Sequence, residues 1–240
     1  MKRIPLGTNP NAKQEAIFLV IWCANAKPWL FYDEASDATR HQSMPAFIML
    51  DRYDGNVGFI GGGRKPQSSL IESLQAELEE ETGLGIEDID LSKVELFASH
   101  ELSIVTHIAH YQVEFQEFLT LQACIASKQS QTLHQLSSNL NQYQQNTKRL
   151  KSLEIEKCHF MAEVTGVKSV LVLDFSRYHP NGELDKSKGI INTLQSSFSS
   201  SVIEEMVVFL IEIIGIPQED VERWLTLAKH DTKAILNQAF

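Results

Sequence analysis

Runs of apolar residues along the chain predict five strands and place two of them inside a sheet. The runs at 16–24 and 46–50 are continuously apolar, which is typical of strands covered on both faces. Further strands are predicted at 94–99, 107–118 and 167–175, and polar and apolar residues alternate along the second of these. Because helical patterns lie between and after the strands, the sequence predicts an α/β fold.

An amphipathic helix is predicted directly after the glycine-rich stretch 61–63. Its buried stripe consists of three leucines spaced four residues apart, Leu70, Leu74 and Leu78. Ser69 is a favourable N-cap, and Glu72 three positions later completes a capping box. Gly83 is placed to end the helix in a left-handed conformation. These signals define both ends of the helix.

Helical patterns dominate the second half of the chain. Residues 119–160 are rich in Gln, Ser and Asn and predict a polar helical insertion. Residues 192–215 carry an apolar helical face, and 217–240 predict a C-terminal helix that docks through Trp224. We expect residues 1–240 to form a single domain with these additions.

Composition narrows the functional classes. The hydrophobic content of 43% is ordinary for a soluble globular protein, and no apolar run is long enough to span a bilayer. We therefore expect no membrane partner. Cys23, Cys124 and Cys158 lack metal-binding spacing, so we expect a cytoplasmic protein with reduced thiols. The net charge of -10 does not favour RNA as a partner, although it does not exclude a local basic groove that binds RNA. The sequence is also compatible with a homodimer.

Three carboxylates share one face of the predicted helix. Glu77, Glu80 and Glu81 stand at i, i+3 and i+4, and such like charges destabilise a bare helix by roughly a few tenths of a kcal/mol per pair. A divalent cation reverses the sign of that interaction, and oxygen-only ligands suit Mg²⁺ or Mn²⁺. The alternative is a solvated acidic run with no ligand.

The glycine stretch and the helix together resemble the Nudix box of the Nudix hydrolases. The matching residues are Gly62, Glu77, Leu78, Glu80, Glu81, Gly83 and Leu84. The resemblance implies an α/β/α sandwich around a mixed sheet, with a C-terminal helical extension. It also implies that the three glutamates bind Mg²⁺ or Mn²⁺, that the backbone of Gly61 and Gly62 approaches the substrate, and that water attacks a phosphorus atom.

Residues 46–62 resemble more specifically the branch of that family that includes the snoRNA-decapping and inosine diphosphatase enzyme. This resemblance implies that Arg52 and Tyr53 contact a phosphate or a base. Glu163 matches a carboxylate that completes metal binding or takes a proton from the attacking water, and Glu205 falls where the branch has a base-holding glutamine. The alternatives are a hairpin salt bridge for Arg52, turn packing for Tyr53 and an ordinary loop position for Glu163.

Two positions depart from the box of the family. Ser68 stands in place of its first glutamate and Ala76 in place of its arginine, two charges that commonly pair. Because both partners are lost together, no buried charge is stranded, and we interpret the double change as a structural substitution.

We therefore expect a metal-dependent Nudix pyrophosphohydrolase. Its substrate would be linked to a nucleoside diphosphate, either a purine nucleoside diphosphate or triphosphate or an RNA 5′ cap. The alternatives are a Nudix-fold module that binds nucleotide or RNA without turnover, and a structural protein whose box only folds a loop.

Overall fold

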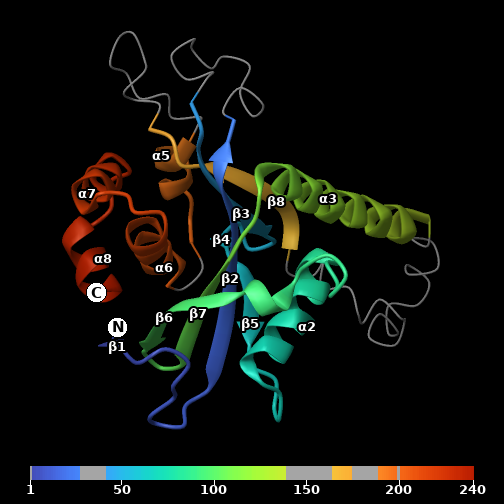
Figure 1. Cartoon of the computed structure of the whole chain (residues 1–240), viewed down its shortest axis with the longest axis horizontal. Helices are drawn as coiled ribbons and strands as arrows, with labels where there is room; N and C mark the ends of the chain where they lie inside the picture. The colour runs from blue at the N-terminus through green and yellow to red at the C-terminus, as the bar shows by residue number, and fades with distance from the viewer. Residues whose placement is uncertain (1, 28–41, 139–163, 175–188, 199–200) are drawn as a thin grey trace.

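A mixed β-sheet crosses the middle of the protein, and helices pack on both of its faces (Figure 1). This computed structural model describes residues 2–27, 42–138, 164–174, 189–198 and 201–240. Within those residues the sheet comprises β1 (Lys2–Arg3), β2 (Glu15–Ala26), β3 (Met44–Arg52), β4 (Val57–Gly58), β5 (Ile60–Gly63), β6 (Glu95–Glu101), β7 (Val105–Gln112) and β8 (Val164–Leu171).

The long strand β2 lies at the centre of the sheet. On one side it pairs in parallel with β7, which pairs in turn with β6, and β6 carries the short edge strand β1. On the other side β2 pairs antiparallel with β5 along its first half and with β3 along its second half. Strand β3 also pairs with β4 and β8. The glycine stretch therefore runs beside the first half of β2, with Gly61 opposite Phe18 and Gly62 opposite Ile17.

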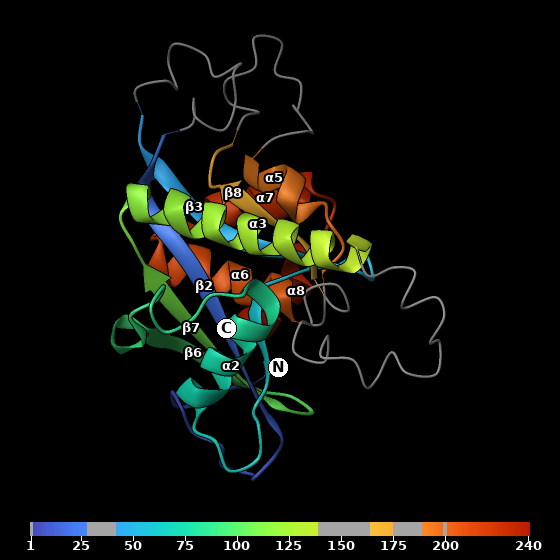
Figure 2. The same ribbon diagram turned by 90° about the vertical axis from the view of Figure 1, so that its right-hand side faces the viewer.

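Alternate residues of β2 point into two separate cores, one on each face of the sheet. Ile17, Leu19 and Ile21 belong to the first core, and Val20 and Trp22 belong to the second. The first core is covered by α2 (Leu70–Thr82) and α3 (Phe115–Ser138), which Figure 2 shows crossing the near face. The second is covered by α5 (Gly189–Leu194), α6 (Val202–Val208), the π-helix Phe209–Ile213, α7 (Gln218–Leu227) and α8 (Thr232–Ala239). The predicted α/β/α sandwich with C-terminal helices is confirmed.

The predicted strand at 107–118 is wrong in its second half. Strand β7 ends at Gln112 and α3 begins at Phe115. Alternation of polar and apolar residues continues into the first helical turn, which hides the helical spacing of Phe118, Leu121 and Ile125. These three side chains are buried in the first core, so the start of α3 packs on the sheet. The predicted insertion beyond Ser138, 139–160, lies outside the described residues.

Two other predicted segments divide differently in the structure. The helical pattern at 192–215 is broken after Leu194, and the chain runs beside β4 before α6 begins, with the Val57 amide donating to the Ser197 carbonyl at 2.8 Å. Strand β8 spans Val164–Leu171 instead of 167–175. Strands β2, β3 and β6 confirm the predictions at 16–24, 46–50 and 94–99.

The C-terminal segment forms two helices where one was predicted. Lys229 adopts a left-handed conformation (φ 69°) that ends α7, and the carboxylate of Asp231 caps α8 by accepting from the Ala234 amide. Trp224 docks as expected, because it is buried and its indole N–H donates to Asp174 at 3.2 Å. Among the described residues, the helices are all too short or too polar to cross a membrane. A 3₁₀ turn at Leu91–Lys93 connects α2 to β6.

Candidate functional site

Helix α2 begins and ends as the sequence predicts. The Ser69 hydroxyl accepts from the Glu72 amide at 3.2 Å, and the Glu72 carboxylate accepts from the Ser69 amide at 2.7 Å. Gly83 closes the helix with φ 70°. From α3, the ammonium group of Lys128 donates to the Gly83 carbonyl and lies 3.0 Å from Asp88. A cation at a helix C-terminus is favourable, so α3 fixes the end of α2 that carries the glutamates.

Glu81 is tied to the glycine stretch. Its side chain is only 2% exposed, and its Oε2 atom accepts from the Gly61 amide at 2.8 Å. Its other oxygen lies 3.5 Å from the guanidinium of Arg52, at the end of β3. Two donors therefore hold this carboxylate in place beside β5.

Packing within the protein requires glycine at positions 61 and 62. A Cβ at Gly61 would lie 2.1 Å from the Ile17 carbonyl of β2, and the backbone there has φ 137°. A Cβ at Gly62 would lie 2.8 Å from the carboxylate of Glu77. The approach of these glycines to a substrate stays a prediction; the contacts that the structure shows are with strand β2 and with Glu77. The two glycines thus bring Glu77 and Glu81 to neighbouring points of one backbone segment.

The third glutamate has a different neighbour. An oxygen of Glu80 lies 2.5 Å from the ammonium group of Lys65, which comes from the loop between β5 and α2. The two side chains are 30% and 38% exposed, and an exposed ion pair of this kind contributes about 0–1 kcal/mol. This ion pair with Lys65 is therefore only a weak restraint on Glu80.

Three carboxylates with oxygen donors on one helical face suit a hard divalent cation chemically. Within the part of the chain that the structure describes, however, no three His, Cys, Asp or Glu side chains gather as a metal-binding group. Glu77 and Glu81 already face the same glycine segment, and Glu80 faces Lys65. The donor set therefore fits Mg²⁺ or Mn²⁺ if Glu80 exchanges its weak ion pair for the metal.

The other predicted site residues lie at three different places. Arg52 is beside Glu81, and the neighbouring Tyr53 is 67% exposed on the turn that follows β3. Glu205 lies on α6, in the helical layer on the opposite face of the sheet from α2 (Figure 1). The structure does not bring Glu205 to the three glutamates. Glu163 lies outside the described residues.

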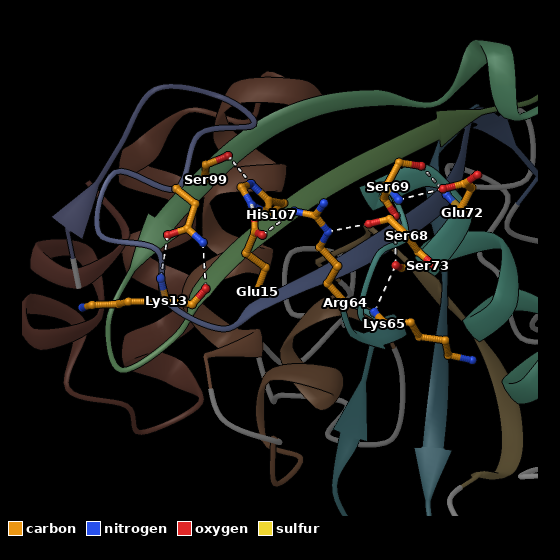
Figure 3. A network of polar contacts seen from close by, with 11 residues as sticks. Lys13, Glu15, Arg64, Lys65, Ser68, Ser69, Glu72, Ser73, Ser99 and His107 are labelled. Atoms are coloured by element: carbon orange, nitrogen blue, oxygen red, sulfur yellow. Dashed lines mark hydrogen bonds and ion pairs between the residues drawn. The ribbon is translucent and has the colours of Figure 1, made fainter.

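Arg64 holds the loop that leads into α2 (Figure 3). Its Nε atom donates to the Ser68 carbonyl at 2.7 Å, and its Nη1 atom lies 2.5 Å from Glu15 on β2. Glu15 also contacts His107 at 3.1 Å, and the second ring nitrogen of His107 contacts the Ser99 hydroxyl at 2.9 Å. Burial alone would raise the pKa of Glu15, but the hydrogen bonds from Arg64 and His107 outweigh it and lower that pKa. Arg64 therefore anchors the loop at Ser68, where the box glutamate is missing.

Replacing Arg64 by methionine is expected to lower the free energy of unfolding by about 1–2 kcal/mol, because the carboxylate of Glu15 loses its cation and the Ser68 carbonyl loses its donor. Urea unfolding measures the change. Lys93→Met is the matched control, since Lys93 pairs only across an exposed 3.5 Å contact with Asp90. Equal stability of the two variants would show that Arg64 anchors nothing.

Glu205 is buried in the second core with an unusual ionisation. One oxygen accepts from the Ser201 hydroxyl at 2.6 Å, and the other has no hydrogen-bond partner among the described residues. Burial raises the pKa of Glu205 to about 7; the Ser201 hydroxyl opposes this, and the neighbouring charge of Glu204 adds to it. Near neutral pH a large fraction of Glu205 is therefore protonated, and a protonated carboxyl both donates and accepts, as a glutamine amide does.

The contribution of Glu205 to the free energy of unfolding should therefore fall as the pH rises from about 4.5 to about 7. In that window the folded state holds a proton on Glu205 that the unfolded state has released, so raising the pH favours unfolding. We expect Glu205→Gln to match wild type at pH 5 and to exceed its free energy of unfolding by about 3 kcal/mol at pH 8. Urea unfolding at both pH values tests this, with the exposed Glu79→Gln as control. A pH-independent difference would show that Glu205 is ionised normally.

Sequence analysis did not predict several contacts of this region. Arg64, Glu15 and His107 belong to three separate segments, and the sheet register brings them together, with Ile17 opposite His107 in the β2–β7 pair. Their mutual contacts could not be read from local spacing. The one available signal was the adjacency of two cations to the glycine stretch.

The chain was compared with solved structures, with curated proteins and with models of protein families. Among solved structures, similarity is found to a MutT/nudix family protein from Enterococcus faecalis, with 17% identity, 44% of this chain and 39% of that chain covered, and a TM-score of 0.32. The pyrophosphohydrolase BsRppH of Bacillus subtilis is 13% identical, with 48% of this chain and 66% of that chain covered and a TM-score of 0.30. A C. elegans Ap4A hydrolase is 16% identical, with 42% of this chain and 66% of that chain covered and a TM-score of 0.28. No curated protein matches the sequence.

The sandwich and its glutamate-bearing helix define a Nudix protein. The chain belongs to the Nudt16-like family, described as U8 snoRNA-decapping enzyme-like, whose model matches residues 26–150, slightly more than half of the chain. That match confirms the resemblance drawn from the box and from the segment before it, and it is the finding on which the assignment rests.

Proposed function

We propose that this protein is a metal-dependent pyrophosphohydrolase that cleaves a nucleoside diphosphate-linked substrate. The observation that carries the proposal is the convergence of Glu77 and Glu81 on the backbone of Gly61 and Gly62. Carboxylates held at a fixed backbone segment are suited to a divalent ion and its phosphate ligand. Membership of the family supports the same class of reaction.

Glu77, Glu80 and Glu81 would hold Mg²⁺ or Mn²⁺. When bound, the metal would neutralise the diphosphate and lower the pKa of the attacking water. Glu81 is already oriented by the Gly61 amide, and Arg52 stands beside it with a guanidinium suited to a phosphate oxygen. We assign removal of the water proton to a carboxylate of the box or to Glu163.

The nucleobase of the substrate would be held by residues outside the Nudix box. Tyr53 offers an exposed ring for stacking on a purine. We assign no base contact to Glu205, because it is buried in the second core, on the opposite face of the sheet from the three glutamates. We propose that the substrate is a purine nucleoside diphosphate or triphosphate, or an RNA 5′ cap.

A purified-protein screen tests the proposal. Nucleoside diphosphates and triphosphates, dinucleotides, nucleotide sugars and cap analogues are incubated with Mg²⁺ or Mn²⁺, and the products are separated by chromatography. We expect a nucleoside monophosphate from at least one purine substrate, and none when the metal is chelated. Absence of product from every substrate with both metals would contradict the proposal.

A small nucleotide is favoured over long RNA because the chain carries a net charge of -10. Binding measured across a salt titration distinguishes the two, since an RNA that contacts many phosphates gives a steep loss of affinity with salt. We also propose a cytoplasmic enzyme, since both described cysteines, Cys23 and Cys124, are free thiols. Gel filtration decides whether it forms a homodimer.

The second candidate is a nucleotide-binding module without turnover. Ser68 and Ala76 favour it because they replace two charged residues of the box, and the ion pair of Glu80 with Lys65 favours it because it occupies one of the three carboxylates. Calorimetry that shows nucleotide binding, together with no product in the screen, would identify such a module.

A further inference from the structure

A cleft of about 600 Å³ lies beside the loop that precedes α2. Residues 13–15 and 63–67 line it, with three cations, Lys13, Arg64 and Lys65, and a single carboxylate, Glu15. Cations therefore outnumber carboxylates in the lining, although Lys13 pairs with Glu101 at 3.0 Å and Arg64 pairs with Glu15 at 2.5 Å. The volume of the cleft is that of a small-molecule site and exceeds what one phosphate ion needs.

The cations of this lining are held to different degrees. Arg64 contacts Glu15 and the Ser68 carbonyl, and His107 holds Glu15 from the other side, so its guanidinium is fixed (Figure 3). Lys65 is anchored only at its backbone, where its amide donates to the Ser73 hydroxyl at 3.2 Å. Its ammonium group lies in an exposed pair with Glu80 that contributes about 0–1 kcal/mol. Lys65 can thus change partner without disturbing the loop.

Lys65 connects the cleft to the proposed metal centre. It lines the cleft, and its ammonium group contacts one of the three glutamates proposed to hold Mg²⁺ or Mn²⁺. A divalent ion at Glu80 would repel an ammonium group a few ångströms away. The long, flexible side chain of Lys65 can then extend over the cleft, where its ammonium group can bind an anion.

We propose that the cleft is a second phosphate-binding site, and that Lys65 couples it to the divalent metal by leaving Glu80 for the phosphate when the metal binds. This inference rests on the proposed function, because it takes Glu80 as a metal ligand. The bound group is a phosphate carried by a nucleotide chain or a free phosphate ion. Gly63 leaves open space at the wall, since a Cβ there would meet no atom within 4 Å. Because binding free energies are reciprocal, phosphate should strengthen metal binding by the same factor.

The test measures phosphate and metal binding separately. Equilibrium dialysis with radiolabelled inorganic phosphate, and in a second arm with an RNA trinucleotide, is carried out with and without Mn²⁺, and free Mn²⁺ is measured by electron paramagnetic resonance. Wild type is expected to bind phosphate about tenfold more tightly with Mn²⁺. Tighter binding of the trinucleotide would identify a nucleotide chain as the source of the phosphate, and tighter binding of inorganic phosphate would identify the free ion.

Three variants test whether Lys65 is the coupling residue and whether phosphate binds in the cleft. Lys65→Gln should lose the tenfold enhancement yet bind Mn²⁺ about two- to fivefold more tightly, because Glu80 no longer has a competing cation. Gln67→Glu places a negative charge in the cleft and should weaken phosphate binding without changing Mn²⁺ binding. The control, Lys93→Gln, removes a distant exposed cation and should behave as wild type.

Undiminished enhancement in Lys65→Gln would overturn the inference, as would phosphate binding that Gln67→Glu leaves unchanged. In both cases Mn²⁺ binding by wild type would leave the proposed function intact. If Mn²⁺ does not bind wild type at all, the proposed metal centre and the inference both fail.

Discussion

Replacing Glu80 by glutamine is expected to reduce hydrolysis by at least a hundredfold. The variant keeps the shape of the side chain but removes the charge that would bind the metal, and loss of a metal ligand weakens a stabilisation of several kcal/mol in the transition state. Because Glu80 is partly exposed and its pair with Lys65 is weak, the free energy of unfolding should change by less than about 1 kcal/mol. Initial rates with Mn²⁺ and urea unfolding measure the two quantities.

Glu79→Gln is the matched control for this experiment. Glu79 precedes Glu80 on α2 and is exposed, so the rate of this variant should stay within about twofold of wild type. Equal rates for wild type and Glu80→Gln would remove Glu80 from the metal centre. A parallel loss in both variants would indicate a general effect of the net charge of the helix.

The largest expected loss of stability comes from Gly61→Ala. The new methyl group would stand 2.1 Å from the Ile17 carbonyl, in a backbone conformation with φ 137° that other residues rarely adopt. Neither β2 nor β5 can move away, because the two strands are hydrogen-bonded from Ala16 to Leu19. We expect a decrease of about 4 kcal/mol or more in the free energy of unfolding, measured by urea denaturation.

Gly63→Ala provides the comparison at the same strand. A Cβ there meets no atom within 4 Å, so the change should cost less than about 1 kcal/mol. Similar losses for the two variants would mean that the glycine stretch is not packed against β2 as described.

The part of this architecture that the sequence predicts is the part fixed by local chemistry. The capping box at Ser69 and the left-handed Gly83 define α2 from neighbouring residues alone, and the apolar runs of β2 and β3 need no partner to be recognised. Where two periodicities overlap, the prediction is wrong, as at Phe115, because the alternating pattern of a strand continues into the first turn of a helix.

The contacts of the site depend on tertiary structure and could not be predicted in the same way. Lys65 reaches Glu80 across fifteen positions, and Arg64 reaches Glu15 only because β2 and β5 are adjacent. The contact of Gly61 also depends on tertiary structure, because its missing side chain accommodates β2. Spacing selects the candidate residues, whereas the tertiary structure determines what they contact.

Glu77, Glu80 and Glu81 are proposed to hold a divalent ion beside Gly61 and Gly62. Diffraction from crystals grown with Mn²⁺, recorded at the manganese absorption edge, tests this proposal most directly. We predict an anomalous peak about 2.1 Å from oxygens of at least two of these carboxylates, next to the glycine backbone. A map with no peak there at saturating Mn²⁺, or with manganese bound only elsewhere, would contradict the account.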